Sequence, residues 1–210
     1  MSEEKMSRQE KKERQIEQIQ KLMDENNGIV KTSQLYSLGL DYRRIQVFVE
    51  YGILERIKNG YYAMNYRQKS EEELILSLFS DSVLSMESAL YYYHYLSEKP
   101  YRWTIAVDKN TSKSRFKIEY PLVHPYYTEP EVMTLGTIKI PFGNGEMNIY
   151  CKERLICDVL KYEDRMDKTN LQKALRAFLT DKEKDIAALL DYARERKVLS
   201  KVRNQIGVWL

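Results

Sequence analysis

Residues 41–62, DYRRIQVFVEYGILERIKNGYY, contain the pattern that decides the fold of the first part of this chain. Asp41 is a good N-cap for the helix that follows it, and Gly52 supplies a typical helix end. Beyond Gly52, Asn59 and Gly60 separate two short runs of strand-forming residues, which predicts a tight β-hairpin with positive φ at both turn residues. The stretch therefore predicts a basic helix followed directly by a two-stranded ribbon.

The residues before this stretch predict two further helices and a short strand. Apolar residues at helical spacing over 8–26 predict a first helix, and the apolar run 28–30 predicts a strand. Thr32 or Ser33 can cap a second helix, which a glycine ends. Two short helices joined by a turn that contains glycine form a helix-turn-helix, and the hairpin is then its wing. Residues 1–68 are therefore predicted to form a winged helix-turn-helix domain.

The positive charge of the chain is concentrated in this region. The whole protein has a formal net charge of +3, whereas residues 28–70 alone contain seven Lys or Arg and three Asp or Glu. Such an excess is the electrostatic footprint of a part that contacts nucleic-acid phosphates. A mildly basic solvated face is the alternative interpretation of the same composition.

The helical periodicity of the third helix assigns its faces. Ile45, Phe48 and Val49 recur on one side and are expected to pack against the first helix. The opposite side would then face the major groove of double-stranded DNA, where arginine pairs with guanine and glutamine with adenine. A winged helix used only for protein contacts is the alternative. The predicted DNA-binding residues are Thr32, Ser33, Tyr42, Arg43, Arg44, Gln46, Val47, Arg56, Lys58 and Asn59.

The remaining residues, 69–210, predict a second domain, and the chain as a whole is expected to be α+β. Helical periodicity returns near residue 71, again near Ser85, and from Glu153 to the end of the chain. The second domain is expected to combine a small mixed or antiparallel sheet with packed helices. Its predicted strands are rich in β-branched or aromatic residues and span 103–108, 115–120, 132–135, 137–142 and 146–151.

The second domain has no pattern that predicts catalysis. His94 and His124 stand in separate segments with no cysteine at metal-ligand spacing, so no metal site is expected. No glycine-rich loop opens a helix to bind phosphate. No strand presents the clustered carboxylates and lysine that a metal-dependent nuclease needs. The protein is expected to be no enzyme and to need no cofactor.

The sequence also lacks the features of export and membrane insertion. No apolar run approaches the roughly 18 residues that span a bilayer, and the first residues, MSEEKMSRQEKKERQ, are too charged for a signal peptide. The two cysteines, Cys151 and Cys157, do not make a disulfide framework. We therefore expect a cytoplasmic protein with no membrane partner.

Both halves of the chain contain distinctive motifs. They are Gly39-Leu40, Gly52-x-Leu54-x-Arg56-Ile57 and Gly60-x-Tyr62, followed by SMESALYYYHY (85–95), WTIAVD (103–108) and ERLICDVLKYEDRMD (153–167). These motifs resemble those of the abortive-infection E-type antitoxins, the antitoxin half of type IV toxin–antitoxin pairs. The resemblance implies an autorepressor that binds inverted repeats in its own promoter through its winged helix. It also implies a second domain that counteracts a nucleotidyltransferase-like toxin, typically without a tight permanent complex.

Basic residues of the closing helices are the candidate contact surface for the toxin, with an ordinary solvated helix face as the alternative. The alternative function is a stand-alone winged-helix transcription factor whose second domain senses a small ligand. The product of the adjacent gene would discriminate between the two functions. The candidate surface residues are Lys173, Arg176, Arg194, Arg196 and Lys201.

Overall fold

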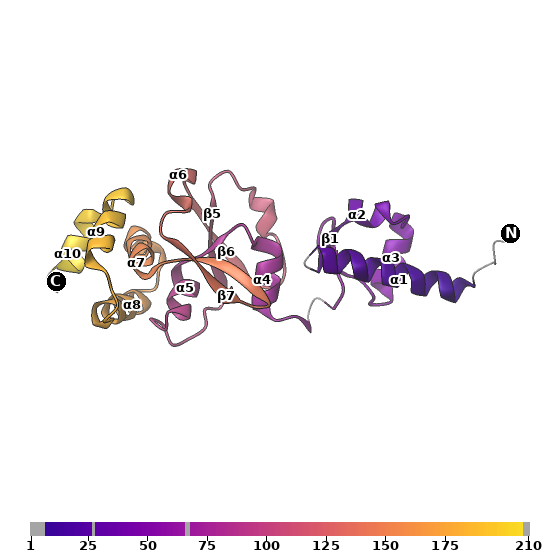
Figure 1. Cartoon of the computed structure of the whole chain (residues 1–210), viewed down its shortest axis with the longest axis horizontal. Coiled ribbons are helices and arrows are strands. Elements are labelled where there is room, and N and C mark those ends of the chain that lie inside the picture. Colours follow the sequence, from indigo (N-terminus) through magenta and orange to yellow (C-terminus); the bar gives the residue numbers. More distant parts are fainter. Residues whose placement is uncertain (1–6, 27, 66–67, 208–210) are drawn as a thin grey trace. The chain divides into compact units, whose positions relative to one another are not determined.

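A computed structural model describes residues 7–26, 28–65 and 68–207 and divides the chain into two compact units. The first unit extends to Leu78 and includes Ile118–Tyr120, and the second unit contains the remaining residues from Phe79 onward. The fold is α+β, as the sequence predicted. Figure 1 shows the elements of each unit. Residues 66–67, beside the predicted domain boundary, lie outside the described residues.

The first unit begins with three helices and three antiparallel strands. Its elements are α1 (Arg8–Glu25), β1 (Ile29–Lys31), α2 (Thr32–Ser37), α3 (Tyr42–Glu50), β2 (Glu55–Lys58) and β3 (Tyr61–Ala63). The strands lie in the order β1-β3-β2, so β3 is central and the β2–β3 hairpin forms one side of the sheet. The predicted helices, the predicted short strand and the predicted hairpin are therefore all present.

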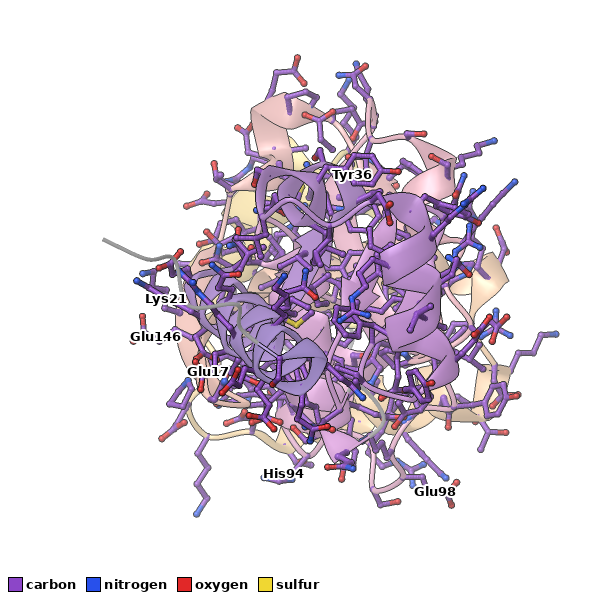
Figure 2. All side chains as sticks on the ribbon, turned by 90° about the vertical axis from the view of Figure 1, so that its right-hand side faces the viewer. Glu17, Lys21, Tyr36, His94, Glu98 and Glu146 are labelled. Carbon is purple, nitrogen blue, oxygen red and sulfur yellow. The ribbon has the colours of Figure 1, made fainter. Side chains whose placement is uncertain are left out.

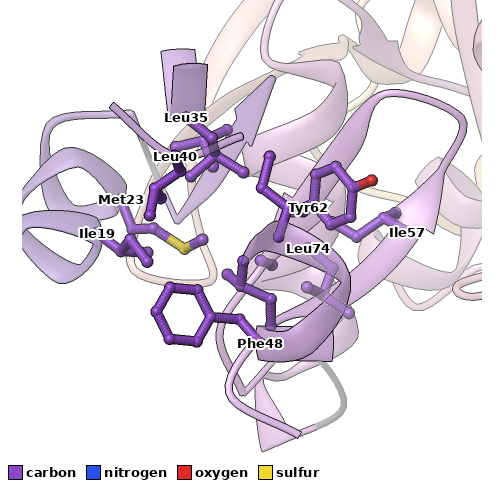
Figure 3. Close-up of a cluster of buried hydrophobic side chains, with 12 residues drawn as sticks. Ile19, Met23, Leu35, Leu40, Phe48, Ile57, Tyr62 and Leu74 are labelled. Carbon is purple, nitrogen blue, oxygen red and sulfur yellow. The ribbon is translucent and has the colours of Figure 1, made fainter. Parts of the chain in front are cut away.

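Apolar side chains from all three helices meet those of the small sheet in one core (Figure 3). Ile19 of α1, Phe48 of α3 and Tyr62 of β3 are each at most 2% exposed. Leu74 of α4 (Glu71–Phe79) belongs to the same cluster. The first unit therefore continues past residue 68, where the sequence pattern placed the boundary.

The second unit is built on a five-stranded mixed sheet. Strands lie in the order β6-β5-β4-β8-β7, in which β5 is parallel to β6 and β4 is parallel to β8. Figure 1 shows the last helices gathered beside this sheet. The elements are β4 (Val83–Leu84), α5 (Met86–Tyr92), β5 (Trp103–Asp108), β6 (Val123–Thr128), α6 (Pro130–Met133), β7 (Thr137–Phe142), β8 (Gly145–Tyr150), α7 (Lys152–Lys161), α8 (Lys168–Thr180), α9 (Ile186–Glu195) and α10 (Leu199–Gln205).

The strand predicted at 115–120 is wrong. A 3₁₀ helix, η2 (Lys113–Phe116), begins this segment, and its aromatic residue serves local packing instead of a strand. The Phe116 ring stacks on the Phe79 ring with centroids 5.5 Å apart, and Arg115 forms an ion pair with Asp81. The Phe116 ring also packs edge-on against the ring of Tyr127 in β6, with centroids 6.2 Å apart, so the segment packs against the sheet without adding a strand to it.

The strand predicted at 132–135 is also wrong, and β6 was missed. Pro130 stands at the first position of α6, where its fixed φ suits a helix start and its missing N–H costs nothing. β6 contains Pro125, which argues against a central strand in a sequence pattern. In the structure β6 is an edge strand, where a proline is tolerated.

A buried charge cluster joins α7 to the end of α9. Asp158 accepts a hydrogen bond from Arg154 Nε at 3.2 Å and another from Arg196 Nε at 2.6 Å. Both arginine side chains are at most 1% exposed, and that of Asp158 is 4% exposed. Arg154 Nη1 also donates to the carbonyl oxygens of Val132 and Leu135, each at 2.9 Å. Arg196 Nη1 also lies 3.5 Å from Glu129 Oε2, so one buried and one half-exposed carboxylate face the two buried guanidinium groups.

Removing the charge of Asp158 should destabilise the protein strongly. Asp158→Asn leaves the buried Arg154 without a counter-charge and leaves Arg196 with only the half-exposed Glu129. Breaking a buried ion pair in this way costs about 3–5 kcal/mol. Asp191→Asn is the matched control, because its pair with Arg194 lies at the surface and such pairs contribute about 0–1 kcal/mol. Urea unfolding followed by circular dichroism measures both free energies of unfolding. Equal losses in the two variants would contradict the assigned role of Asp158.

Candidate nucleic-acid interface

A short turn with a fixed geometry connects α2 to α3. Leu40 is 2% exposed and anchors this turn in the core. Gly39 adopts a φ of +78°, a left-handed conformation that favours glycine. Asp41 then caps α3, because its side chain accepts a hydrogen bond from the backbone N–H of Arg44 at 2.7 Å. The turn and the cap together fix where α3 begins.

The outer face of α3 carries the residues that the sequence predicted as readers of DNA. Ile45 and Phe48 are fully buried, which turns the opposite side of the helix toward solvent. Arg43 is exposed, and the Tyr42 side chain is 56% exposed. The Arg43 side chain is therefore exposed to solvent and has no ion-pair or hydrogen-bond partner among the described residues.

The side chains of Gln46 and Val47 are less exposed to solvent than that of Arg43. Both are half-buried, so they lie between the core side and the outer side of α3. The Nε2 atom of Gln46 is buried and has no hydrogen-bond partner among the described residues. Of the predicted readers on α3, Arg43 and Tyr42 are thus the two whose side chains are openly exposed.

Arg44, also predicted as a DNA-binding residue, is half-buried and has partners within the first unit. Its Nε donates a hydrogen bond to Gln15 Oε1 of α1 at 2.9 Å. Its guanidinium also lies over the Phe48 ring, 4.6 Å from the centroid. The Arg44 side chain therefore links α3 to α1.

The β2–β3 hairpin has the predicted position but a different turn. Gly60 has a φ of +77°, whereas Asn59 is absent from the residues with positive φ in the described chain, so the predicted pair of positive φ values is wrong. A register shift between Arg56 and Lys58 marks a β-bulge in β2. A bulge increases the local twist of a hairpin, which a type I′ turn would otherwise supply.

Several cationic side chains gather around the hairpin. Arg56 Nη2 donates to Asn59 Oδ1 at 2.8 Å, which holds the guanidinium beside the turn. The Nζ atoms of Lys58 and Lys31 lie 4.4 and 5.9 Å from the centroid of the Tyr61 ring. Lys31 was not among the predicted DNA-binding residues. Its place beside the hairpin follows from the register of the sheet, in which Lys31 lies opposite Tyr61.

The start of α2 differs from the predicted cap. Thr32 and Ser33 are the first residues of α2, and Lys31 is the N-cap. The side chain of Gln34, at the third position of α2, bonds back to the N-cap residue, because its Oε1 accepts a hydrogen bond from the backbone N–H of Lys31 at 2.8 Å. The backbone N–H of Thr32 donates to the carbonyl oxygen of Gly60 at 2.9 Å, which ties α2 to the hairpin tip. This leaves Ser33 exposed and Thr32 half-buried.

Two tyrosines flank the turn between α2 and α3. Tyr36 is 49% exposed and Tyr42 is 56% exposed, and both line a shallow surface hollow over Gly39. Figure 2 shows Tyr36 among the outward side chains of the first unit, together with Glu17 and Lys21 of α1. Tyrosine hydroxyls are among the groups that contact phosphate oxygens in protein–DNA complexes.

The predicted contact surface of the closing helices is not one exposed face. Arg196 is 2% exposed, so the prediction that it lies at the surface was wrong. Its guanidinium is buried because it forms an ion pair with the buried Asp158. Lys201 is half-buried and donates to the carbonyl oxygen of Leu160 at 2.9 Å. Arg194 is exposed but paired with Asp191, which leaves Lys173 and Arg176 as the open cations of α8.

The described residues hold no group of three or more His, Cys, Asp or Glu side chains that could bind a metal ion. Within the same part of the chain, no helix is long and apolar enough to cross a bilayer. Neither the protein-family models nor the curated proteins that were compared with this sequence match it.

Replacing Arg43 and Arg44 separately should distinguish a surface role from a packing role. Arg44→Ala removes the hydrogen bond to Gln15 and the contact with Phe48, and each contact contributes about 0.5–1.5 kcal/mol. Arg43→Ala removes no described contact, so its effect on the free energy of unfolding should stay within about 0.5 kcal/mol. Denaturant unfolding of both variants measures the difference. A larger loss in Arg43→Ala than in Arg44→Ala would reverse these assignments.

Proposed function

We propose that the first unit is a winged helix-turn-helix that binds double-stranded DNA. The observation that carries the proposal is the arrangement of α2, a glycine turn and α3, followed at once by an antiparallel hairpin with basic side chains. In a winged helix the second of the two helices enters the major groove and the hairpin lies beside it. The exposed Arg43 near the start of α3 is then placed to contact base edges.

The chemistry of α3 assigns different tasks to its arginines. Arg43 carries the fork of N–H donors that matches the O6 and N7 acceptors of guanine. Arg44 is held by Gln15 and the Phe48 ring, so it positions α3 and does not reach the bases. Gln46 and Val47 lie further along the helix and would contact adenine and a thymine methyl from its margin.

The hairpin and the start of α2 would hold the DNA backbone. Lys31 and Lys58 approach the same Tyr61 ring, which places two positive charges on one side of the hairpin. Arg56, fixed by Asn59, adds a third charge beside the turn. Phosphate contacts of this kind position a protein on the duplex and give affinity without sequence preference.

We propose further that the protein is the antitoxin and autorepressor of a type IV toxin–antitoxin operon that acts in abortive infection by phage. Repression would use inverted repeats in the promoter, and the second unit would counteract a nucleotidyltransferase-like toxin. This part is supported by the resemblance of the motif 153–167. Since every residue of α7 from Glu153 to Leu160 is buried, this part of the motif belongs to the core of the second unit. A toxin contact must then use other residues, and Lys173 and Arg176 are the exposed candidates.

A stand-alone winged-helix transcription factor with a ligand-sensing second unit is the second candidate function. What favours it is a cavity of about 390 Å³ in the second unit, lined by charged and aromatic side chains. A nucleotidyltransferase-like product of the adjacent gene would favour the antitoxin, and its absence would favour the ligand sensor.

DNA binding should depend steeply on salt, and two variants should lose it in different ways. Arg43→Ala should cost about 1–3 kcal/mol on the cognate site and relax the base preference at one position. Lys58→Ala should weaken binding to all sequences alike and reduce the salt dependence, because it removes one phosphate contact. Fluorescence anisotropy on the promoter and on a scrambled duplex, at roughly 50 to 200 mM salt, measures both effects. Uniform losses in both variants would show that α3 does not read sequence.

Neutralisation of the toxin should depend on the exposed cations of α8. Charge reversal at Lys173 and Arg176 should abolish growth rescue when the protein is co-expressed with the toxin, while promoter repression is retained. Charge reversal at the exposed Lys109 and Lys113 of the same unit is the matched control and should leave rescue intact. Full rescue by the Lys173 and Arg176 variant would exclude α8 as the contact, and absence of rescue by the unmodified protein would overturn the antitoxin proposal.

A further inference from the structure

A cavity in the second unit brings together residues that lie far apart in the sequence. It has a volume of about 390 Å³, and Glu87, Tyr101, Arg102, His124 and Arg165 are among the side chains that line it. This volume lies in the range of about 300–1,000 Å³ that small-molecule sites usually have. A second cavity of about 260 Å³ shares Glu87 and Tyr101 with the first, so the two adjoin.

The strand order of the sheet explains why these residues meet. β4 is antiparallel to β5, and β5 is parallel to β6, so the end of β4 lies at the same edge as the beginnings of β5 and β6. Glu87 follows β4 in the first turn of α5, Arg102 precedes β5, and His124 lies near the start of β6. Arg165, the last residue of the 3₁₀ helix η3 (Glu163–Arg165), completes the wall.

The floor of the cavity is rigid. Ser88 and Thr104 exchange two buried hydrogen bonds between backbone N–H groups and side-chain oxygens, at 2.9 and 2.8 Å. The Thr104 hydroxyl also donates to the carbonyl oxygen of Ser85 at 2.7 Å. These bonds fix the start of α5 to β5 and hold Glu87 in place. A site held in this way loses little conformational entropy when a ligand binds.

The two arginines of the cavity form no ion pair with a carboxylate in the part of the chain that the structure describes. Arg102 and Arg165 are both exposed. The Arg165 guanidinium is oriented by the Tyr162 ring, at 5.3 Å from its centroid. The pKa of His124 is lowered by burial and by the positive charges of Arg102 and Arg165. All three groups therefore favour an anion in this cavity.

Glu87 favours a hydrogen-bond donor on the ligand, whereas the two arginines favour an anion. Its Oε2 atom is buried and receives no hydrogen bond from any described residue. Burial raises the pKa of this carboxyl, although the nearby Arg102 opposes the shift. A buried carboxyl oxygen without a partner is costly, and a hydroxyl or amino group of a ligand would satisfy it.

We infer that this cavity binds a small hydroxylated phosphate monoester, with the phosphate at Arg102 and Arg165 and a hydroxyl group at Glu87. Guanidinium groups form paired hydrogen bonds with phosphate and carboxylate oxygens. The guanidinium groups of Arg102 and Arg165 together carry a charge of +2, which matches the charge of a phosphate monoester, about −1.5 to −2 at neutral pH, better than the single charge of a carboxylate. Ligand binding here does not require that the first unit bind DNA.

The two histidines of the chain allow a direct test on the full-length protein. His124 lines the cavity, whereas His94 lines neither of the two cavities described above and lies at the surface (Figure 2). Titration with ribose 5-phosphate should shift the His124 Hε1 proton NMR signal and raise its pKa, because a nearby dianion favours the imidazolium. The His94 signal should stay in place. Ribose should cause no shift, and inorganic phosphate should bind at least tenfold more weakly than ribose 5-phosphate.

Variants separate the two halves of the site. Arg102→Ala with Arg165→Ala should weaken ribose 5-phosphate at least tenfold, and Glu87→Ala should remove its advantage over inorganic phosphate. Arg203→Ala, at an exposed arginine of α10 that lines neither cavity, is the control and should bind normally. Undiminished binding in the double arginine variant would overturn the inference. So would equal affinity for inorganic phosphate, no shift with any probe, or shifts caused by a DNA duplex alone.

Discussion

Burial of Ile45 and Phe48 fixes the rotation of α3, and the function proposed for the first unit depends on that rotation. A helix turned by one residue, about 100°, would direct Arg43 toward α1 instead of toward solvent. The Phe48 ring also supports the Arg44 guanidinium, which in turn bonds to Gln15 of α1. Packing therefore decides which of two adjacent arginines is free to contact a ligand.

In the second unit the comparable constraint is electrostatic. Asp158 lies between the buried guanidinium groups of Arg154 and Arg196 and joins α7 to the end of α9. Arg154 also lies against Gly136, where an added Cβ would be 2.8 Å from the Cβ of Arg154, so a larger residue has no room there. This cluster explains why α7 carries charged residues although it is buried along most of its length. The charged residues of α7 in the motif at 153–167 therefore stabilise the fold of the second unit.

The sequence predicted the elements that depend on neighbouring residues. It did not predict the features that depend on strand order or on contacts between distant residues. Asp41, Gly52 and Gly60 marked α3 and the hairpin, because caps and turns are local. β6 was missed because the effect of Pro125 depends on whether a strand is central or at an edge. Arg196 was misplaced because helical spacing says nothing about a carboxylate 38 residues away. The cavity residues share no spacing at all, and only the strand order brings them together.

The arginines of this chain show how the partner of a side chain separates structure from function. Arg154 and Arg196 are neutralised by a buried carboxylate, so they stabilise the fold. Arg44 is engaged by an amide oxygen and a ring, so it orients a helix. Arg43, Arg102 and Arg165 have no carboxylate partner among the described residues. Each of these three is exposed and near other groups that favour an anion, and both proposed sites contain them. Phosphate binding is therefore expected at two separate places in the molecule. The first unit would bind the phosphates of a DNA backbone, and the cavity of the second unit would bind a small phosphate ester.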